Sequence, residues 1–544
     1  MPISPANACP RELRVRLLHN FATFILIACP GLLSICAERQ AKSAEQGSVP
    51  NIILILADDL GYADVACYGG KIRTPHIDRL AAEGMRFTDA HTASSVCTPT
   101  RYSLLTGRYS WRSRLKQGVL GGLSPRLIEP GRMTVASLLQ EQGYRTACIG
   151  KWHLGMDWVV KPGAGVSRLE IEPRAQVFNV DFAQPIANGP NSVGFDYYFG
   201  ISASLDMVPY TFIENDRVTS LPTEDRDFPM MLGREAGGRT RKGPAAPGFD
   251  TSDVLPVIVR KSCEFLDRCA EAPGSDKPFF LYVPFASPHT PILPTASWQG
   301  KSGMNPYADF VMETDAAVGE IMAALDRHEL TEQTLVIFTS DNGCSPQAKF
   351  DELAAHGHLP SGPLRGHKAD LFEGGLRVPL VVRWPERVAP GTVSPEIVCQ
   401  VDIMATLAEI LNLPLPPDAG EDSISFLPVL RGAKGSRDHL VSHSINGSFA
   451  VRRGDWKLLL SADSGGWSEP RPGSRQAAGL PLLQLYHLGD DLGEQHNVWE
   501  QHPERVGDLI TLLERIVADG RSTPGEKQPN DGPVDLRARM KVTR

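Results

Sequence analysis

Residues 51–59 read Asn-Ile-Ile-Leu-Ile-Leu-Ala-Asp-Asp, an apolar run that ends abruptly in two carboxylates. A short continuous apolar run with such an end is typical of a strand that is buried on both faces of a parallel sheet. In these sheets, ligands bind beyond the carboxyl ends of the strands. The stretch therefore predicts the fold class and, at Asp58 and Asp59, the edge of the sheet where a functional site would lie.

Strand-like and helix-like segments alternate along the rest of the chain. This alternation predicts an α/β fold with a large mixed, mostly parallel sheet flanked by helices. After about residue 440 the pattern changes to short strands, which predicts a smaller C-terminal α+β subdomain. The predicted helices are 75–83 (with Thr74 as N-cap), 135–142 and 307–325, and the predicted strands are 51–57, 146–149, 279–285, 335–339, 378–382, 449–452 and 456–460.

The composition is that of a globular protein. The 544 residues include 55 Lys+Arg and 63 Asp+Glu, for a net charge of −8, and 42% of them are hydrophobic. A mild negative charge excludes a generally basic nucleic-acid-binding protein. In the body of the chain, no apolar run approaches the ~20 residues that a membrane-spanning helix needs.

The N-terminus has the pattern of a secretory signal. Arg11, Arg14 and Arg16 precede an apolar stretch, 21–36, that ends in small residues. We therefore expect a signal peptide over 1–37 and export to the periplasm or the extracellular space. A buried helix or a signal anchor is the alternative, and Leu26-Ile-Ala-Cys29 also resembles a lipoprotein box, which would give a lipid-anchored form. The expected division of the remainder is a catalytic domain at 48–438, the subdomain at 439–520 and a flexible tail at 521–544.

The segment Cys97-Thr-Pro-Thr-Arg101, followed by Tyr-Ser-Leu-Leu-Thr-Gly107, carries the strongest chemical signal. Thr98 and Pro99 are expected to start a helix that Gly107 ends, so Cys97 would lie at its N-terminus. The partial positive charge there favours anions and lowers the pKa of a thiol. Arg101, one turn further on, points to the same side. The pattern predicts a reactive cysteine beside a cation, with a buried structural cysteine as the alternative.

Polar residues also follow several of the predicted strands. Asp58 and Asp59 end one strand, and Asp341 and Asn342 end another. Three carboxylates and an amide are hard oxygen donors, which suit Ca²⁺ or Mg²⁺ and not zinc. His153 and His289 follow two further strands. Taken singly, each would be an ordinary histidine, but together they are predicted to act as an acid and a base in one pocket.

These segments resemble the type I, formylglycine-dependent sulfatases, an arylsulfatase-like family of the alkaline phosphatase superfamily. Cys97–Arg101 matches the C-x-P-x-R motif of that family. The resemblance covers about residues 50–385, and the tail patterns 454–458 and 485–488 are similar to the family's C-terminal subdomain. The other matching segments, in family order, are Asp58-Asp59, Gly150-Lys-Trp-His-Leu-Gly155, Ser287-Pro-His289, Thr339-Ser-Asp-Asn-Gly343, and Lys368 with Phe372-Glu-Gly-Gly-Leu-Arg-Val-Pro379.

The resemblance implies a sulfuric ester hydrolase that releases inorganic sulfate from a carbohydrate or aryl sulfate. A separate formylglycine-generating enzyme would oxidise Cys97 to formylglycine (3-oxoalanine). The implied metal is Ca²⁺, bound by Asp58, Asp59, Asp341, Asn342 and residue 97. The implied catalytic residues are Cys97, Arg101, Lys151, His153, His289 and Lys368, and the implied substrate-binding residues are Lys151, His289, Lys368 and, by a loose match, Ser204.

The implied mechanism has two steps. A hydroxyl of the hydrated aldehyde attacks sulfur, and His289, alone or with Lys368, protonates the departing alcohol. His153 then takes the proton of the second hydroxyl, which expels sulfate and restores the aldehyde. Two alternatives remain open: a phosphodiesterase or phosphonate monoester hydrolase on the same fold, and a non-catalytic protein that binds sulfated glycans.

Two features stay undecided by the sequence. Seven cysteines follow the predicted signal, an odd number for an exported protein, so one should be free or modified; a disulfide between Cys263 and Cys269 is conceivable. Trp467 lies in a Gly-rich segment, where a tryptophan could stack on a sugar or simply pack.

Overall fold

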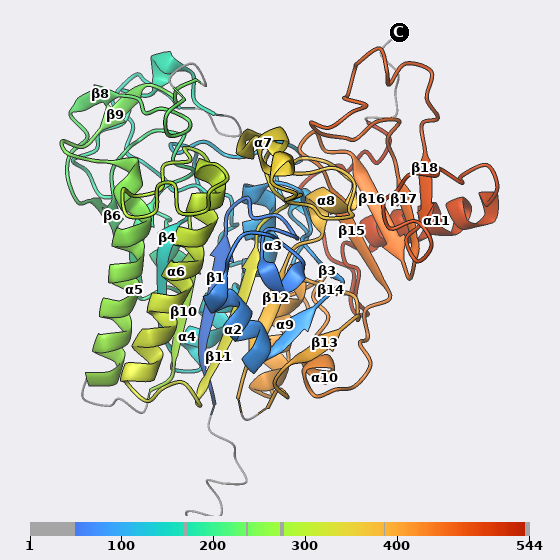
Figure 1. Cartoon of the computed structure of the whole chain (residues 1–544), viewed down its shortest axis with the longest axis horizontal. Coiled ribbons are helices and arrows are strands. Elements are labelled where there is room, and N and C mark those ends of the chain that lie inside the picture. The colour runs from blue at the N-terminus through green and yellow to red at the C-terminus, as the bar shows by residue number, and fades with distance from the viewer. Residues whose placement is uncertain (1–48, 167–170, 235–237, 272–276, 386, 539–544) are drawn as a thin grey trace, which may run out of the picture. The chain divides into compact units, whose positions relative to one another are not determined.

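A twisted ten-stranded sheet forms the centre of the computed structural model, which describes residues 49–166, 171–234, 238–271, 277–385 and 387–538 (Figure 1). The predicted signal peptide, 1–37, lies outside these residues. The strands, in their order across the sheet, are β13 (Thr392–Ser394), β2 (Met85–Phe87), β12 (Leu380–Arg383), β11 (Thr334–Ser340), β1 (Asn51–Ala57), β10 (Phe279–Pro284), β4 (Arg145–Lys151), β5 (Tyr197–Ile201), β6 (Ile213–Glu214) and β7 (Arg217–Val218).

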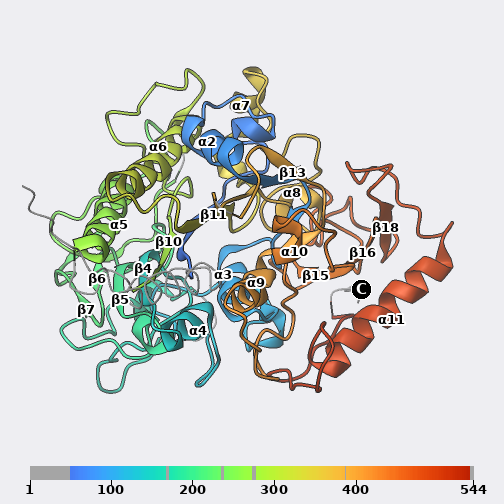
Figure 2. The same ribbon diagram turned by 90° about the horizontal axis from the view of Figure 1, so that it is seen from below.

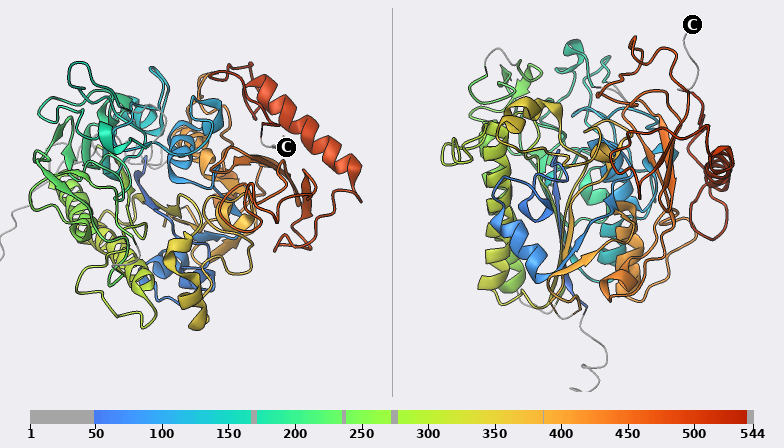
Figure 3. Two further views of the ribbon diagram at one scale, coloured as in Figure 1. Left: turned by 90° about the horizontal axis from the view of Figure 1, so that it is seen from above. Right: turned by 45° about the vertical axis from the view of Figure 1, so that its right-hand side comes forward.

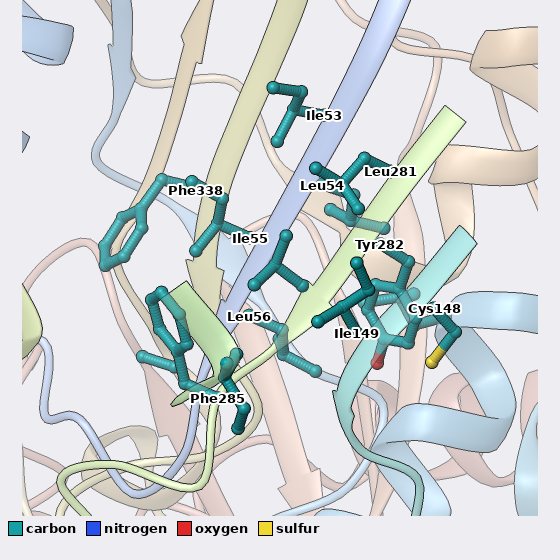
Figure 4. Close-up of a cluster of buried hydrophobic side chains, with 14 of the residues drawn as sticks. Ile53, Leu54, Ile55, Leu56, Cys148, Ile149, Leu281, Tyr282, Phe285 and Phe338 are labelled. Atoms are coloured by element: carbon teal, nitrogen blue, oxygen red, sulfur yellow. The ribbon is translucent and has the colours of Figure 1, made fainter. Parts of the chain in front are cut away.

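The five strands β11, β1, β10, β4 and β5 are parallel, whereas β12 and β6 run antiparallel to their inner neighbours. In the register of the sheet, Ile52 of β1 lies between Phe280 of β10 and Leu335 of β11. All seven residues of β1 are buried, because helices cover both faces of the sheet; this explains why the run shows no polar alternation. Figure 4 shows the apolar side chains of these strands packed together. The predicted mixed, mostly parallel sheet is confirmed.

Helices lie on the two faces of the sheet, and Figure 2 shows the two groups. On one face α6 packs against both α2 and α5, and on the other α3, α4 and α9 pack against one another. Short helices and two-stranded ribbons complete the body. The helices are α2 (Pro75–Glu83), α3 (Cys97–Thr106), α4 (Val135–Glu141), α5 (Val254–Glu271), α6 (Pro306–Arg327), α7 (Phe350–Ala355), α8 (Glu373–Leu376), α9 (Ile403–Ile410) and α10 (Leu427–Leu430), and the ribbons are β3 (Ala90–His91) with β14 (Val398–Cys399) and β8 (Glu224–Arg226) with β9 (Gly243–Ala245).

Thr74 differs from its prediction as a capping residue. It precedes α2, but its side chain caps no N–H group of that helix. Its hydroxyl instead accepts a hydrogen bond from the backbone N–H of Ala66 (2.8 Å) and lies 3.2 Å from the Asp78 carboxylate. The Thr74 hydroxyl therefore forms a hydrogen bond with the preceding turn instead of capping α2.

The predicted short strands of the C-terminal region form a separate antiparallel sheet (Figure 3). The strands lie in sequence order, and α11 (Pro503–Asp519) packs against β16 and β17. Beyond α11, the backbone N–H of Asp531 donates to the Arg112 carbonyl oxygen (2.7 Å). The strands are β15 (His439–His443), β16 (Phe449–Arg453), β17 (Trp456–Leu459) and β18 (Gln484–His487).

The seven cysteines of the described chain are all free. Cys263 and Cys269 lie six residues apart on α5, which corresponds to a rise of about 9 Å along a helix. Their Cα atoms are thus further apart than the roughly 7 Å that a disulfide can span. The conceivable disulfide between them is wrong. In the described part of the chain, no helix combines the length and apolar character required to cross a membrane.

His443, at the end of β15, should make stability depend on pH. Burial lowers the pKa of His443 to about 4, and the nearby charge of Lys116 acts in the same direction. The unfolded chain takes up this proton near the ordinary histidine pKa of about 6.5. The folded chain takes it up only at lower pH. The free energy of unfolding should therefore fall by up to about 3 kcal/mol as the pH drops from about 6.5 to about 4.

Urea denaturation at several pH values checks this expectation. The variant His443→Gln should lose this part of the pH dependence. The control His496→Gln, which changes an 82% exposed histidine side chain, should keep it. An unchanged pH dependence in His443→Gln would show that His443 is not the responsible group.

Candidate active site

The residues predicted to carry the chemistry meet beyond the carboxyl ends of the central strands. In Figure 1 these ends lie at the top of the sheet, below α7 and α8. Each of these residues except His153 and Ser204 contacts another member of the group, and His153 is near enough for the charges of Lys151 and Asp58 to act on it. All of them are buried. They come from the ends of β1 (Asp58, Asp59), β11 (Asp341, Asn342) and β4 (Lys151, His153), from the segment after β10 (His289), from the start of α3 (Cys97, Arg101) and from the segment before α8 (Lys368).

The oxygen cluster fits a divalent cation. Ligand atoms of Asp58, Cys97 and Asp341 lie within 4.8 Å of one another, close to twice the Ca²⁺–O distance of about 2.3–2.6 Å. Asp58 Oδ1 and Asn342 Oδ1 are buried and have no hydrogen-bond partner among the described residues. Burial and the charge of Asp58 raise the pKa of Asp341. Carboxylates this close together are more readily ionised when a cation lies between them.

Three buried cations balance the three carboxylates. Lys151 Nζ lies 2.5 Å from Asp58 Oδ2. Arg101 Nη2 lies 2.8 Å from Asp341 Oδ2. Lys368 Nζ lies 2.7 Å from the Asp59 carboxylate. The site thus has no net charge before a metal binds, and a divalent cation would make it positive, which favours an anionic substrate.

Lys368 stays protonated in this arrangement. Burial opposes its charge, but the Asp59 carboxylate raises the pKa of Lys368 above its usual value. A lysine with a raised pKa is a poor proton donor near neutral pH. These surroundings favour Lys368 as a fixed positive charge more than as the acid that protonates the leaving group.

Cys97 is the first residue of α3, one position before the predicted start of the helix. The expectation of a lowered thiol pKa is wrong. Burial raises the pKa of Cys97, and the opposing charge of Lys151 does not compensate for it. The helix N-terminus therefore does not make this cysteine a reactive thiolate, and its place among the cations needs another explanation.

The two histidines are held in different ways. His153 Nε2 donates to the carbonyl oxygen of Leu120 (2.8 Å), because a carbonyl can only accept. His153 Nδ1 is buried and free of any hydrogen bond to the described residues. Burial, assisted by Lys151, holds the pKa of His153 well below its usual range. His153 is therefore a neutral imidazole with a free lone pair, as a general base requires.

His289 offers the opposite nitrogen to the site. Its Nδ1 donates to the carbonyl oxygen of Thr290 (2.5 Å), and its Nε2 lies 3.7 Å from Asp59 Oδ2. Burial, followed by the charge of Lys368, lowers the pKa of His289. The Nε2 atom thus faces the cluster, where it can exchange a proton with a leaving group.

Backbone features fix the oxygen cluster in place. Asp59 has φ = +64° and His153 has φ = +56°, a left-handed conformation that non-glycine residues adopt at a cost and that often marks functional sites. A Cβ atom on Gly343 would lie 1.8 Å from the carbonyl oxygen of Gly374. Only glycine can follow Asp341-Asn342 at this position.

Tyr307 and Asp64 support the loop that carries Asp59, a role that no local sequence pattern indicates. The Tyr307 hydroxyl lies 2.5 Å from Asp64 Oδ2 and 3.1 Å from the Asp59 carbonyl oxygen. Asp64 also accepts a hydrogen bond from the Gly61 N–H (2.6 Å) and lies 2.8 Å from His358 Nε2. Because Asp64 and Tyr307 are 243 positions apart in the sequence, no pattern within a short window could have connected them.

Replacing Tyr307 with phenylalanine should lower the free energy of unfolding by about 1–2 kcal/mol, because a buried carboxylate and carbonyl lose their donor. Tyr282→Phe is the matched control. Its hydroxyl is also buried but has no hydrogen-bond partner in the described chain, so its removal should leave stability unchanged or higher. Urea denaturation of both variants is the measurement, and equal effects would contradict the role of Tyr307.

Ser204 is not brought into the cluster by any described contact. It is buried, its carbonyl oxygen accepts from the Met207 N–H (3.0 Å), and its hydroxyl has no hydrogen-bond partner among the described residues. Its role as a substrate-binding residue therefore stays a prediction.

Comparison with known proteins gives consistent matches. The sequence model of the Sulfatase family matches residues 50–413, and that of the N-sulphoglucosamine sulphohydrolase C-terminal region matches 367–464. The chain is 35% identical over 532 residues to an N-acetylgalactosamine-6-O-sulfatase of Bacteroides thetaiotaomicron, covering 90% of this chain and 98% of that protein. It is 36% identical over 466 residues to human arylsulfatase A, covering 82% and 83% of the two chains.

Solved structures agree with these matches. One from work on the metabolism of multiple glycosaminoglycans by Bacteroides thetaiotaomicron has a TM-score of 0.74 and 35% identity, covering 86% of this chain and 99% of that one. A second, the PsFucS1 sulfatase from Pseudoalteromonas sp., has a TM-score of 0.65 at 24% identity, covering 90% and 95% of the chains, and supports the fold alone.

Proposed function

Because the chain belongs to the sulfatase family and is a sulfatase, we propose that it hydrolyses the sulfate esters of carbohydrates. The observation that carries this proposal is that three carboxylates, three cations and two histidines are buried together at one edge of the sheet. The relative named as an N-acetylgalactosamine-6-O-sulfatase, matched over 98% of its length, supports a carbohydrate over an aryl substrate. These relatives do not support the phosphodiesterase or the non-catalytic alternative.

A bound Ca²⁺ is part of the proposal. Asp58, Asp59, Asp341 and Asn342 would hold it, together with the side chain of residue 97. When bound, the ion would neutralise negative charge on the oxygens of the sulfate group. The unpartnered oxygens of Asp58 and Asn342 and the hard-donor set support this assignment.

Formylglycine at position 97 is the proposed nucleophile, and its hydrate would supply the attacking hydroxyl. Modification by a formylglycine-generating enzyme would account for an unreactive thiol at the centre of the site. Arg101, 3.1 Å from the Lys151 carbonyl oxygen, ties α3 to β4. Lys151 and Lys368 supply positive charge to the sulfate oxygens.

The histidines divide the proton transfers. His153 Nδ1, neutral and unpartnered, would take a proton from the group at position 97. His289 Nε2, held facing the cluster by Thr290, would give a proton to the departing alcohol when the ring is in its imidazolium form, with protons on both nitrogens, and would become the neutral imidazole in that step. Because the two histidines present different ring nitrogens to the site and are held by different backbone carbonyls, His153 can act as the base and His289 as the acid.

The experiment is a sulfate-release assay on a panel of substrates. We expect inorganic sulfate from at least one monosaccharide sulfated at O2, O3, O4 or O6, and faster turnover than of 4-nitrophenyl sulfate. 4-Nitrophenyl phosphate should be a poor substrate. Faster cleavage of the phosphate ester than of every sulfate would contradict the proposal.

Export belongs to the proposal as well. A signal peptide over 1–37, with a lipid-anchored form as an alternative, would place the enzyme in the periplasm or outside the cell. The functional division into 48–438, 439–520 and a flexible tail from 521 likewise stays a proposal. The boundary at 438/439 is supported by the antiparallel sheet β15–β18, whose strands pair with one another and with no other described strand.

A further inference from the structure

Trp467, from the loop after β17, lies beside the candidate active site. The Lys368 ammonium is 5.9 Å from the centre of its indole ring and 2.7 Å from the Asp59 carboxylate. Trp467 is half-buried, so the residue is partly open to solvent. None of the described hydrogen bonds uses its indole N–H. The C-terminal sheet thus brings an aromatic face next to a cation that would bind the sulfate.

The loop that carries Trp467 is built onto the segment that carries Lys368. Asp370 Oδ1 accepts hydrogen bonds from the backbone N–H groups of Trp467 (2.7 Å) and Ser468 (3.0 Å). Asp370 Oδ2 accepts one from the His367 N–H (2.9 Å). One buried carboxylate therefore fixes the tryptophan and the lysine segment in a single arrangement.

Gly466 brings the two segments into direct contact. A Cβ atom at this position would lie 2.3 Å from the carbonyl oxygen of Ala369 and 2.5 Å from Asp370 Oδ1. The Leu371 N–H donates to the Ser464 carbonyl oxygen (2.8 Å). The Gly-rich sequence around Trp467 is thus explained by close backbone packing that holds the indole beside Lys368.

We propose that Trp467 is a platform on which the sugar ring of a sulfated carbohydrate stacks while its sulfate lies on Lys368. A sulfate oxygen bonded to Lys368 would lie about 2.8 Å from Nζ. The esterified sugar would therefore come within a few ångströms of the indole. The C–H face of a pyranose packs well on an aromatic ring. This inference rests on the proposed function and extends it to the part of the substrate that leaves.

Polar groups near His289 and Trp467 favour a sugar over a plain aryl group as the part of the substrate that leaves. The amide oxygen of Gln347, an exposed residue, lies 3.4 Å from the Thr290 hydroxyl, next to His289. Ser468, adjacent to Trp467, is half-buried. An aromatic face on one segment and polar groups beside His289 suit a ligand with an apolar face and hydroxyl edges.

The test compares Trp467→Ala with the wild-type enzyme. We expect KM for the best sulfated monosaccharide of the panel to rise about tenfold or more, because the stacked ring loses its apolar contact. The inhibition constant of inorganic sulfate should stay within about twofold, because sulfate alone touches the cations and not the indole. Trp467→Phe should recover most of the affinity for the sugar.

Trp456→Ala is the matched control. Trp456 is a half-buried tryptophan at the other end of β17, where its ring lies 4.7 Å from that of His487 and 4.8 Å from that of His502. Its removal should leave KM for the sulfated sugar unchanged. Thermal unfolding of each variant shows that the compared proteins are folded.

Three results would overturn the proposal. An unchanged KM in Trp467→Ala would show that the indole does not touch the substrate. Equal weakening of sugar sulfate and inorganic sulfate would show that it acts only through Lys368. If the wild-type enzyme cleaved 4-nitrophenyl sulfate but no sulfated sugar, the substrate would not be a sugar that could stack on Trp467. If the wild-type enzyme released sulfate from no ester, the proposed function would fail instead.

Discussion

Replacing Cys97 with alanine is expected to reduce sulfate release by at least about a thousandfold, because the nucleophile of the proposed reaction would be gone. The side chain is small and buried at the first turn of α3, and alanine fits there without new contacts. The fold should therefore survive, with a melting temperature close to that of the wild type. The measurement is sulfate release under saturating substrate, alongside thermal unfolding.

Cys67→Ala is the control for loss of a thiol. Cys67 is partly buried and lies in the short helical turn before α2, away from the oxygen cluster. Its replacement should leave sulfate release unchanged. If Cys97→Ala retained wild-type activity, residue 97 would not be the nucleophile.

Replacing Asp341 with asparagine should remove bound calcium and lower sulfate release by at least about a hundredfold. The carboxylate is both a proposed metal ligand and the partner of Arg101, with Nη2 at 2.8 Å and Nε at 3.1 Å. Its loss leaves the cluster one negative charge short, and the excess positive charge opposes binding of a divalent cation. Calcium per chain, measured by elemental analysis, and sulfate release are the two readouts.

A second buried arginine–aspartate pair gives the matched control. Arg112 Nε lies 2.8 Å from Asp422 Oδ2, both side chains are fully buried, and neither belongs to the cluster. Asp422→Asn should lower stability, since it leaves a buried charge poorly paired, but it should leave the calcium content of folded protein unchanged. Equal calcium loss in both variants would indicate general destabilisation and contradict the assignment of Asp341.

The sequence predicted the centre of the fold because the signal there is local. The apolar runs at β1 and β11 are continuous, since both faces of these strands are buried, and each ends in the polar residues of the site. Parallel strands bring such ends to one edge, so the meeting of Asp58 with Asp341 followed from the pattern. The strand pairing of β1 with β11 confirms this inference.

Other features depend on contacts between distant segments. The edge strand β13 and its neighbour β2 have only three residues each, too few for a period to show. Burial outweighed the helix N-terminus at Cys97, and burial cannot be read from a five-residue motif. Trp467 and Lys368 are about one hundred positions apart in the sequence but lie close together in the fold. The neighbours of this tryptophan therefore could not be predicted from the sequence.

The most direct test of the account relates activity to the chemical state of residue 97. Protein is produced with and without a formylglycine-generating enzyme, the fraction of the peptide around residue 97 that carries an aldehyde in place of the thiol is measured by mass spectrometry, and sulfate release is measured on the same samples. The account predicts that activity is proportional to this fraction and vanishes with it. Full activity in protein that carries only the unmodified cysteine would contradict it.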